Sequence, residues 1–439
     1  MYIQKYKFLV NSLLIMIFVF AFCFISFASE EVTLNVSSEV GIHTEAWKTD
    51  IANFEEETGI NIELEQFPFQ KYREKLMLDY ASGQPSYDVN YLSYGWYKAL
   101  VESGQLCSLS REFDLSPLNL EDIPNIDLYY MDKDLHFIPF MNEIAGILYR
   151  KDLFEDPVEK TNFKEKYGYE LAPPKTFKQY KDIAEFFHRP PNLYGVSLMG
   201  KRSVFLTVHF ANRLWGYGGE ILDKEMKPGL NTEAGIAALN DLKEMFKFSN
   251  PASKTHLFHE AVTEFLQGRS AMLEIWSTVL LYANDPKQSQ VVGKVGFSPI
   301  PKTEKCLSKK VPCLYICWGF VISNDSKHKD EAFEFIKYIT SKESEVRTSP
   351  YGNIPARFSA MGDPELQKVH PWMKQIKETM ETSKLTPIYP WITEGATISA
   401  DIISLAVSQF LAGEKSAEDV VDRADKEIYD LLEAGGYYE

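Results

Sequence analysis

The sequence has few cysteines and lacks the short motifs that mark common metal and catalytic sites. Its 439 residues include five cysteines, with no CxxC pair and no HxxxH spacing, so we expect no metal site. No nucleophile elbow or catalytic triad motif is present. The stretch from Gly195 to Lys201 nearly completes a phosphate-binding loop, but Arg202 stands where Ser or Thr is required. We therefore predict no catalytic residue, no cofactor and no nucleotide site.

Positive charge is also scarce. The chain has 46 Lys and Arg residues against 62 Asp and Glu residues, and its formal net charge is -16. An acidic surface disfavours nucleic acid and anionic lipid headgroups as partners. It favours a soluble protein with a small, neutral ligand.

Residues 1–28 have the pattern of an export signal. An apolar run over residues 9–25 follows two lysines, and residues 26–28 resemble a small-x-small cleavage site. Cleavage after residue 28 removes both lysines and no acidic residue, which takes the net charge from -16 to -18. An uncleaved membrane anchor is the alternative. A lipid anchor on Cys23 is not expected, because the bulky Phe22 precedes it.

Four cysteines remain in the mature chain: Cys107, Cys306, Cys313 and Cys317. Cys306 and Cys313 flank a short polar loop, and an exported chain can oxidise them to a disulfide. Free buried thiols are the alternative, because the spacing alone cannot select one pairing.

The length and the pattern of the first hundred residues predict a two-lobed α/β fold. A chain of 439 residues exceeds a single core of ordinary size. Strand and helix patterns alternate over residues 31–96, which is typical of a mostly parallel sheet. Ligands of such sheets bind at the carboxyl ends of the strands. That rule indicates Glu39, Gly41, Tyr94 and Trp96 as candidate ligand contacts.

Residues 137–157 predict a crossing between the two lobes. Two apolar, strand-like runs are separated here by Asn142 and Glu143. We expect Glu143 to face the gap between the lobes, and the alternative is a surface turn inside one domain. A strand over residues 271–276 would carry Glu274 and Trp276 to its end. A buried strand over residues 314–323, with Trp318-Gly319 in its middle, is the candidate for a return crossing.

Several stretches in a fixed order resemble the family 1 extracellular solute-binding proteins of bacterial ABC importers, which include the maltose-binding type. The resemblance covers nearly the whole mature chain, and its strongest stretches are FEEETGINIELE (54–65), IPFMNEIAGILYRKDLFED (138–156), LWGYGGEILD (214–223), GKVGFSPIPK (293–302), CWGFVISNDSKHKDEAFEFIKYITSKE (317–343) and GNIPARFSAMGDPEL (352–366).

The resemblance implies the type II periplasmic-binding fold, with two α/β lobes, three interlobe crossings and a ligand cleft between the lobes. The crossings would lie near Pro139, near residues 315–318 and near residue 366. Lobe I would then comprise residues 29–139 and 315–365, and lobe II residues 140–314 and 366–439.

The resemblance also assigns roles to some candidates. Glu143 matches a ligand-binding Glu of the first crossing, and Trp276 is the nearest match to a Trp that stacks on sugar. The loop at residues 93–96 lacks the carboxylate that the maltose-type proteins often have, which weakens the case for a maltose-like ligand. Cys317 replaces a Gly that many relatives have.

The candidate residues suit a sugar or polyol. Aromatic rings cover the apolar face of a pyranose, and carboxylates accept hydrogen bonds from its hydroxyls. We expect Asn142 and Arg357 to donate to ring or hydroxyl oxygens, and Trp318, Gly319 and Tyr351 to line the cleft. Trp215 and Trp391 are weaker candidates.

We predict a monomeric, periplasmic substrate-binding component that closes on a carbohydrate ligand by a hinge motion and delivers it to an ABC permease. The alternatives are a secreted carbohydrate-active enzyme, for which Glu143 and Glu274 would be the carboxylate pair, and a ligand sensor for a membrane receptor.

Overall fold

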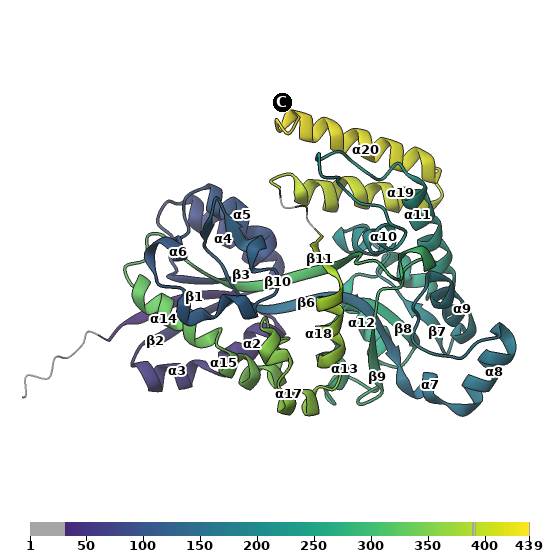
Figure 1. Ribbon diagram of the computed structural model, residues 1–439, viewed down its shortest axis with the longest axis horizontal. Coiled ribbons are helices and arrows are strands. Elements are labelled where there is room, and N and C mark those ends of the chain that lie inside the picture. The colour runs from purple at the N-terminus through teal and green to yellow at the C-terminus, as the bar shows by residue number, and fades with distance from the viewer. Residues whose placement is uncertain (1–30, 389, 391, 439) are drawn as a thin grey trace, which may run out of the picture.

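The computed structural model describes residues 31–388, 390 and 392–438. It is a mixed α/β protein with two lobes joined by long strands (Figure 1). The predicted export signal and Trp391 lie outside the described residues. None of the helices in the described part is long and apolar enough to cross a membrane.

Lobe I begins with three parallel strands. β1 (Thr33–Glu39) lies between β2 (Asn61–Phe67) and β3 (Val89–Ser93) and pairs in parallel with both. Strand and helix alternate along this part of the chain, as the sequence predicts. The helical and short strand elements of this part are α2 (Ile42–Lys48), α3 (Ile51–Thr58), α4 (Phe69–Ala81), α5 (Tyr94–Glu102), α6 (Leu109–Glu112), η1 (Ser116–Leu118), η2 (Leu120–Asp122), η3 (Ile126–Tyr129), β4 (Tyr130–Met131) and β5 (Asp134–Leu135).

Two long strands continue from lobe I into lobe II. β6 (Ile138–Arg150) and β10 (Pro312–Ile322) are antiparallel neighbours near the middle of a nine-stranded sheet. Seven of its strands follow the order β2-β1-β3-β10-β6-β8-β7, in which β8 is Ser270–Trp276 and β7 is Tyr194–Ser197, and the other two pair with β10 and β6. The last residues of β10 pair with β3 in lobe I, and its first residues pair with β11 (Lys384–Pro387). The predicted first crossing and return crossing are therefore these two strands.

Lobe II is built on the second half of β6. β8 (Ser270–Trp276) and β9 (Val295–Pro299) pair antiparallel with this half, and β7 (Tyr194–Ser197) pairs in parallel with β8. The helical elements that accompany these strands are α7 (Lys151–Glu155), α8 (Pro157–Tyr167), α9 (Phe177–Phe187), α10 (Val204–Gly216), α11 (Glu233–Met245), η4 (Phe246–Phe248), η5 (Pro251–Thr255), α12 (Phe258–Leu266), α13 (Val279–Asn284) and η6 (Glu304–Cys306).

After β10 the chain returns to lobe I, where α14 (Lys329–Ile339) contacts α3 and α15 (Lys342–Thr348) contacts α2. η7 (Ser349–Tyr351), α16 (Phe358–Met361) and α17 (Pro364–Val369) follow. Between η7 and α16 the chain runs along the crossing strand: the Asn142 N–H donates to the Ile354 carbonyl at 3.0 Å, and the Ala356 N–H donates to the Phe140 carbonyl at 3.1 Å.

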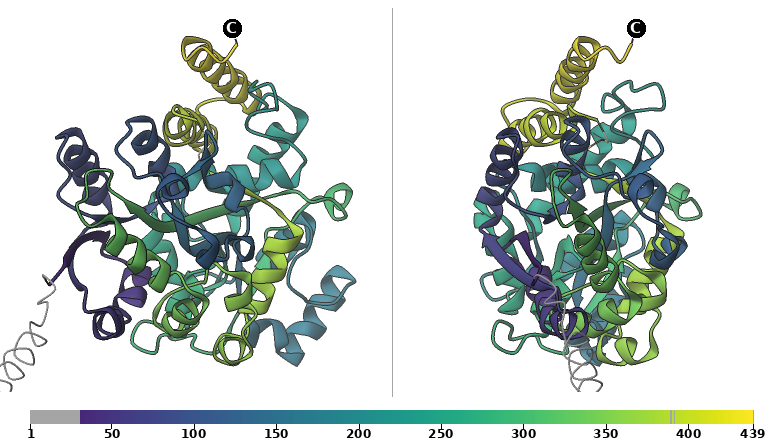
Figure 2. Two further views of the ribbon diagram at one scale, coloured as in Figure 1. Left: turned by 60° about the vertical axis from the view of Figure 1, so that its left-hand side comes forward. Right: turned by 90° about the vertical axis from the view of Figure 1, so that its left-hand side faces the viewer.

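The last part of the chain packs on lobe II. α18 (Met373–Thr382) contacts β9, and β11 follows it. A π-helix, η8 (Thr397–Ile403), leads into α19 (Ser404–Ala412), and α20 (Ala417–Ala434) packs against α19 at one end of the molecule (Figures 1 and 2). The Ser416 hydroxyl caps α20 by accepting from the Asp419 N–H at 3.1 Å.

The described cysteines correct one prediction. Cys306 and Cys313 form no disulfide, and both are buried free thiols, as are Cys107 and Cys317. Cys313 lies in β10, where its thiol is 3.8 Å from the Ala145 carbonyl oxygen, whereas Cys306 is in η6 beside Gly218. Two cysteines that flank a polar loop in the sequence are therefore not bonded to each other here. The structure has the alternative, buried free thiols.

Candidate functional site

The end of β1 carries a carboxylate that is paired with a histidine one helical turn later. Glu39 is the last residue of β1, and its Oε1 lies 2.8 Å from Nε2 of His43 in α2. Both side chains are buried. Gly41, between them, leaves room for this pair, because a Cβ at Gly41 would lie 2.0 Å from Glu39 Oε1. The backbone of Gly41 is extended (φ -158°), so its small size is what the pair requires.

Aromatic rings adjoin this pair. The Trp318 ring lies 4.8 Å from the His43 ring, 5.4 Å from Trp96 and 5.7 Å from Tyr91, measured between ring centroids. Trp318 sits at a bulge of β10, where its register partners are Met141 of β6 and Ser93 of β3. The two crossing strands therefore place this ring beside the end of β1.

Glu143 of the crossing strand lies where groups of both lobes meet. Burial raises the pKa of Glu143 to about 7, although the nearby His43 and a hydrogen bond from Thr278 favour the charged form. Glu39 is close enough to oppose ionisation of Glu143. Thr278 comes from lobe II, immediately after β8, whose end is held by a 2.9 Å hydrogen bond from the Ser277 N–H to the Ile144 carbonyl.

Tyr282 of α13 lies in the same electrostatic environment. Burial raises its pKa to about 12, and Glu143 and Glu39 add to the shift. A group of lobe II is thus influenced by a carboxylate of lobe I. We call the assembled residues the interlobe cluster, and its members are Glu39, His43, Trp96, Glu143, Thr278, Tyr282 and Trp318.

The interlobe cluster can recognise a polyhydroxylated molecule. Its two carboxylates are hydrogen-bond acceptors, and its indole rings offer flat apolar faces. Two buried polar atoms beside these groups, His43 Nδ1 and the Tyr91 hydroxyl, have no hydrogen-bond partner within the described part of the chain. In residues 31–388, 390 and 392–438 no group of three or more His, Cys, Asp or Glu side chains is placed to hold a metal ion.

Two further candidates lie near the cluster, and their contact with ligand stays a prediction. Trp276 ends β8 opposite Ala145, two residues along β6 from Glu143, and only 6% of it is exposed. Tyr94 begins α5 and is 3% exposed, and its hydroxyl donates to the Tyr315 carbonyl of β10 at 3.4 Å.

Asn142 has hydrogen-bond partners inside the protein, and its predicted contact with the ligand stays a prediction. Its side-chain N–H donates to the Ala356 carbonyl at 3.0 Å, and its Oδ1 accepts from the Tyr315 hydroxyl at 2.7 Å. Asn142 is fully buried. Because successive strand residues point to opposite faces, Asn142 binds the returning chain while its neighbour Glu143 points to the other side.

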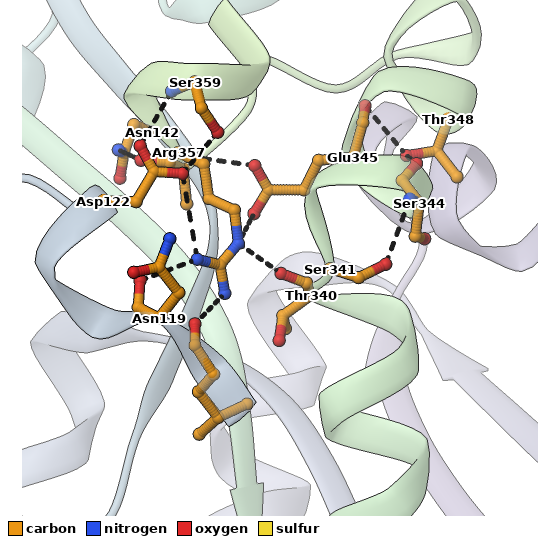
Figure 3. A network of polar contacts seen from close by, with 12 residues as sticks. Asn119, Asp122, Asn142, Thr340, Ser341, Ser344, Glu345, Thr348, Arg357 and Ser359 are labelled. Carbon is orange, nitrogen blue, oxygen red and sulfur yellow. Dashed lines mark hydrogen bonds and ion pairs between the residues drawn. The ribbon is translucent and has the colours of Figure 1, made fainter. Parts of the chain in front are cut away.

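The guanidinium of Arg357 also has partners inside the protein, and its predicted contact with the ligand stays a prediction. It donates to three backbone carbonyls, those of Thr340 at 2.6 Å, Asn119 at 3.0 Å and Leu118 at 2.7 Å (Figure 3). The Arg357 backbone N–H donates to Glu345 at 2.9 Å. This buried network ties the loop before α16 to the end of η1 and to the residue that follows it.

Glu274 likewise has partners inside the protein, and its predicted contact with the ligand stays a prediction. Burial would raise its pKa, but Arg213 and His209 outweigh burial and lower the pKa of Glu274 to about 2. Its two oxygens lie 2.9 and 3.0 Å from Arg213 Nη1, and Oε1 lies 3.0 Å from His209 Nδ1. The carboxylate therefore fastens β8 to α10 in the interior of lobe II.

Gly319 and Tyr351 have different surroundings. A Cβ at Gly319 would lie 2.2 Å from the Ile138 carbonyl oxygen, so this glycine allows the two crossing strands to approach closely. Tyr351 is 60% exposed at the end of η7. Ligand contact by either residue stays a prediction.

Sequence reasoning missed His43, Thr278 and Tyr282. His43 follows the end of β1, so the strand-end rule that indicated Glu39 and Gly41 could have included it. Thr278 and Tyr282 follow β8 in the same way, but the sequence pattern indicated only Trp276, the aromatic residue at the end of the strand. Their convergence on Glu143 depends on the pairing of β6 with β8, which no local pattern displays.

Relatives of known structure share this architecture. A solute-binding protein of an ABC transporter from Agrobacterium radiobacter K84, solved in complex with ribitol, is 25% identical with a TM-score of 0.76, over 91% of this chain and 98% of that chain. The maltose-bound MalE3 of T. maritima is 22% identical, also with a TM-score of 0.76, over 91% of this chain and 100% of that one.

Sequence comparison gives the same family. A probable amino-acid ABC transporter periplasmic-binding protein of Sinorhizobium fredii is 25% identical over 402 residues, which are 88% of this chain and 87% of that protein. The model of the bacterial extracellular solute-binding proteins matches residues 41–346, which is more than half of the chain. The resemblance found in the sequence is thereby confirmed, and the chain belongs to the bacterial extracellular solute-binding protein family.

Proposed function

We propose that this protein is the substrate-binding component of an ABC-type importer and that it binds a carbohydrate or polyol at the interlobe cluster. The observation that carries the proposal is the convergence of two carboxylates and two indole rings, from lobe I and the crossing strands, on one place that Thr278 and Tyr282 of lobe II adjoin. A ligand that contacts groups of both lobes binds the closed arrangement more tightly than the open one. Only such a difference in affinity shifts the equilibrium between the open and closed arrangements.

The chemistry of the cluster favours a neutral, hydroxylated ligand. Glu39 and Glu143 can accept hydrogen bonds from hydroxyls, and charge-assisted bonds of this kind are the stronger sort. The rings of Trp96 and Trp318 can cover the apolar face of a sugar or the carbon chain of a polyol. The ribitol and maltose of the two structural relatives belong to this chemical class, which supports the proposal.

An amino acid is the second candidate, because the Sinorhizobium relative bears that description. Its carboxylate would need a cationic or amide partner, whereas the interlobe cluster contributes two carboxylates and one imidazole already paired with Glu39. Arg357, the cation predicted nearby, is occupied by backbone carbonyls. These contacts favour the hydroxylated ligand.

We propose that the protein binds its ligand without changing it. A glycosidase needs one carboxyl group that holds a proton and a second carboxylate across the same bond. Glu143 meets the first requirement, with a pKa of about 7. Glu274 does not supply the second, because it is held by Arg213 in the interior of lobe II. The pair of Glu143 and Glu274 that the alternative of an enzyme would need is therefore not supported.

The remaining parts of the proposal follow from family membership and from the sequence. We propose a monomer that is exported by a cleavable signal, works in the periplasm and presents its closed form to a membrane permease. A sensor that presents the same form to a membrane receptor is the alternative. We place the lobe boundaries at residues 139/140, 314/315 and 365/366, close to where β6, β10 and α17 lie.

A thermal-shift screen tests the ligand class. Ribitol, mannitol, maltose and a panel of neutral amino acids are added in turn to the mature protein. A ligand at 100 times its dissociation constant adds about 2.7 kcal/mol to the free energy of unfolding. We expect stabilisation by at least one sugar or polyol and recovery of that compound unchanged. Stabilisation by amino acids alone, or release of reducing ends from an oligosaccharide, would contradict the proposal.

A further inference from the structure

A cavity of about 360 Å³ lies on lobe II, outside the interlobe cluster. Its walls come from α11, η4, η5, α19 and Gly200, and α11 and α19 lie in the upper part of lobe II in Figure 1. None of the seven members of the interlobe cluster lines it. Its volume is within the range of roughly 300–1,000 Å³ that small-molecule sites occupy.

Three lysines line this cavity: Lys243, Lys247 and Lys254. The Lys247 ammonium is paired with Glu244 at 2.5 Å. Lys243 and Lys254 form no ion pair with any carboxylate of the described part of the chain, and the Lys243 ammonium lies over the Phe410 ring at 4.7 Å from its centroid. Two uncompensated positive charges thus share one concavity of a chain whose formal net charge is -16.

The rest of the wall is largely apolar. Phe246, Leu411 and Ala412 line it, and Ser408 adds a hydroxyl. A bare inorganic ion would leave this apolar surface in water, whereas an organic anion would cover it while its charged groups reach the lysines.

The glycine-rich stretch that resembles a phosphate-binding loop contributes no backbone donors to this cavity. The Gly200 N–H donates to the Ser253 carbonyl at 2.8 Å, and the Lys201 N–H donates to the His256 carbonyl at 3.1 Å. A Cβ at Gly200 would lie 2.6 Å from the Ser253 carbonyl oxygen, so this glycine serves close packing on η5. Recognition of an anion here rests on the lysine side chains, which act as point charges and accept any compact multivalent anion.

We propose that this cavity is a second binding site, specific for a small organic anion that carries at least two negative charges and an apolar portion. The charged group is a phosphate ester or a set of carboxylates, which share the chemistry that the lysines recognise. The site is independent of the carbohydrate proposed for the interlobe cluster, because the two share no residue.

Isothermal titration with phenyl phosphate and with citrate tests the proposal on the mature protein. The cavity variant carries Lys243→Gln and Lys254→Gln. Both side chains are exposed, so we expect the variant to fold with an unchanged melting temperature. The matched control carries Lys287→Gln and Lys342→Gln, which remove the same charge from two exposed lysines that have no ion pair with a described carboxylate.

We expect the wild-type protein and the control to bind at least one of the two anions, and the cavity variant to bind it at least about tenfold more weakly. Binding should also weaken as salt is raised to about 0.15 M, where exposed charges are screened over roughly 8 Å. Binding of phenyl phosphate alone identifies a phosphate ester, and binding of citrate alone identifies a polycarboxylate. The proposal is overturned if neither anion binds, if the cavity variant binds as well as the control, or if the control loses as much affinity as the cavity variant.

Discussion

The Glu39 carboxylate lies over Gly41 so closely that a Cβ at position 41 would be 2.0 Å from Oε1 and 2.9 Å from Cδ. The carboxylate in turn lies 2.8 Å from His43 Nε2. A glycine therefore holds open the space in which the carboxylate and imidazole of the interlobe cluster meet.

Gly41→Ala should weaken ligand binding without unfolding the protein. The backbone of Gly41 is extended, so alanine fits it, but the Glu39 side chain must turn away and leave His43. We expect the free energy of unfolding to change by less than about 1 kcal/mol, because glycine-to-alanine replacement itself stabilises by a similar amount. Loss of a charge-assisted hydrogen bond should lower the affinity for the best sugar or polyol by roughly 10- to 100-fold.

Calorimetric titration of this variant beside Glu39→Gln provides the check. Both variants should lose affinity, since Gly41→Ala displaces the Glu39 carboxylate and Glu39→Gln removes its negative charge. If Gly41→Ala binds as tightly as wild-type protein, Glu39 does not contact the ligand.

Glu143 should make stability depend on pH between 4.5 and 7. Burial raises its pKa from 4.5 to about 7, so in this window the folded protein keeps a proton that the unfolded chain has lost. The contribution of Glu143 to the free energy of unfolding is fully present below pH 4.5. It falls as the pH rises, by up to roughly 3 kcal/mol at pH 7 and above. Glu143→Gln should therefore be as stable as wild-type protein at pH 4.5 and more stable at pH 8.

Chemical denaturation of both proteins at several pH values measures this difference. Glu414→Gln, at an exposed position, is the control and should follow the wild-type protein throughout. A constant difference between wild-type protein and Glu143→Gln from pH 4.5 to 8 would show that Glu143 does not titrate in this range.

The same carboxyl group should make ligand binding depend on pH. Ligand hydroxyls donate to the ionised form of Glu143, so binding lowers its pKa and releases a proton near neutral pH. Affinity for the sugar or polyol should then rise from pH 5.5 to 8. The Glu143→Gln variant should bind weakly, with affinity that varies little over this range. Equal pH dependence in the two proteins would remove Glu143 from the ligand contacts.

The crossing strand was predictable, but the roles of its polar residues were not. Two apolar runs around Asn142 and Glu143 indicated a strand that enters a second lobe, and β6 has this course. Alternation along a strand sends these two neighbours to opposite faces, but the sequence does not say which face meets the ligand. That choice depends on Ala356 and Tyr315, which are far away in the chain and bind Asn142.

Arg357 and Glu274 illustrate a second limit. Both are charged residues in stretches that suggested a site, and both are used inside the protein. The partners that bury Arg357 include the carbonyls of Leu118 and Asn119, more than two hundred residues earlier. A buried charge needs partners of this kind, and no local pattern reveals whether they exist.

Arg357→Met should destabilise the protein strongly. The three carbonyls that accept from its guanidinium would lose their donors in a buried place. Removing one member of a buried charged network typically costs roughly 3–5 kcal/mol. By contrast, burial raises the pKa of Glu345 well above its usual value, which favours the neutral carboxyl. Glu345→Gln keeps the size of this side chain and an oxygen that can accept from the Arg357 backbone N–H, so it should cost less than Arg357→Met.

Denaturant titration of the two variants at pH 7 compares them directly. A loss for Glu345→Gln as large as that for Arg357→Met would mean that Glu345 is ionised and paired with Arg357. A small loss for Arg357→Met would mean that water or a relaxed loop replaces the guanidinium.

The cysteines of the mature chain should all react as thiols once the protein is unfolded. Burial raises the pKa of Cys107, Cys313 and Cys317 to about 12, so these groups stay protonated and react slowly in the folded state. After denaturation without a reducing agent, a thiol reagent should count four groups per chain, one for each of the four free cysteines of the structure. Dithiothreitol should leave the melting temperature unchanged. A disulfide stabilises a protein by limiting the conformations of the unfolded chain. A count of two thiols, with a lower melting temperature after reduction, would therefore show that Cys306 and Cys313 form the disulfide that the sequence suggested.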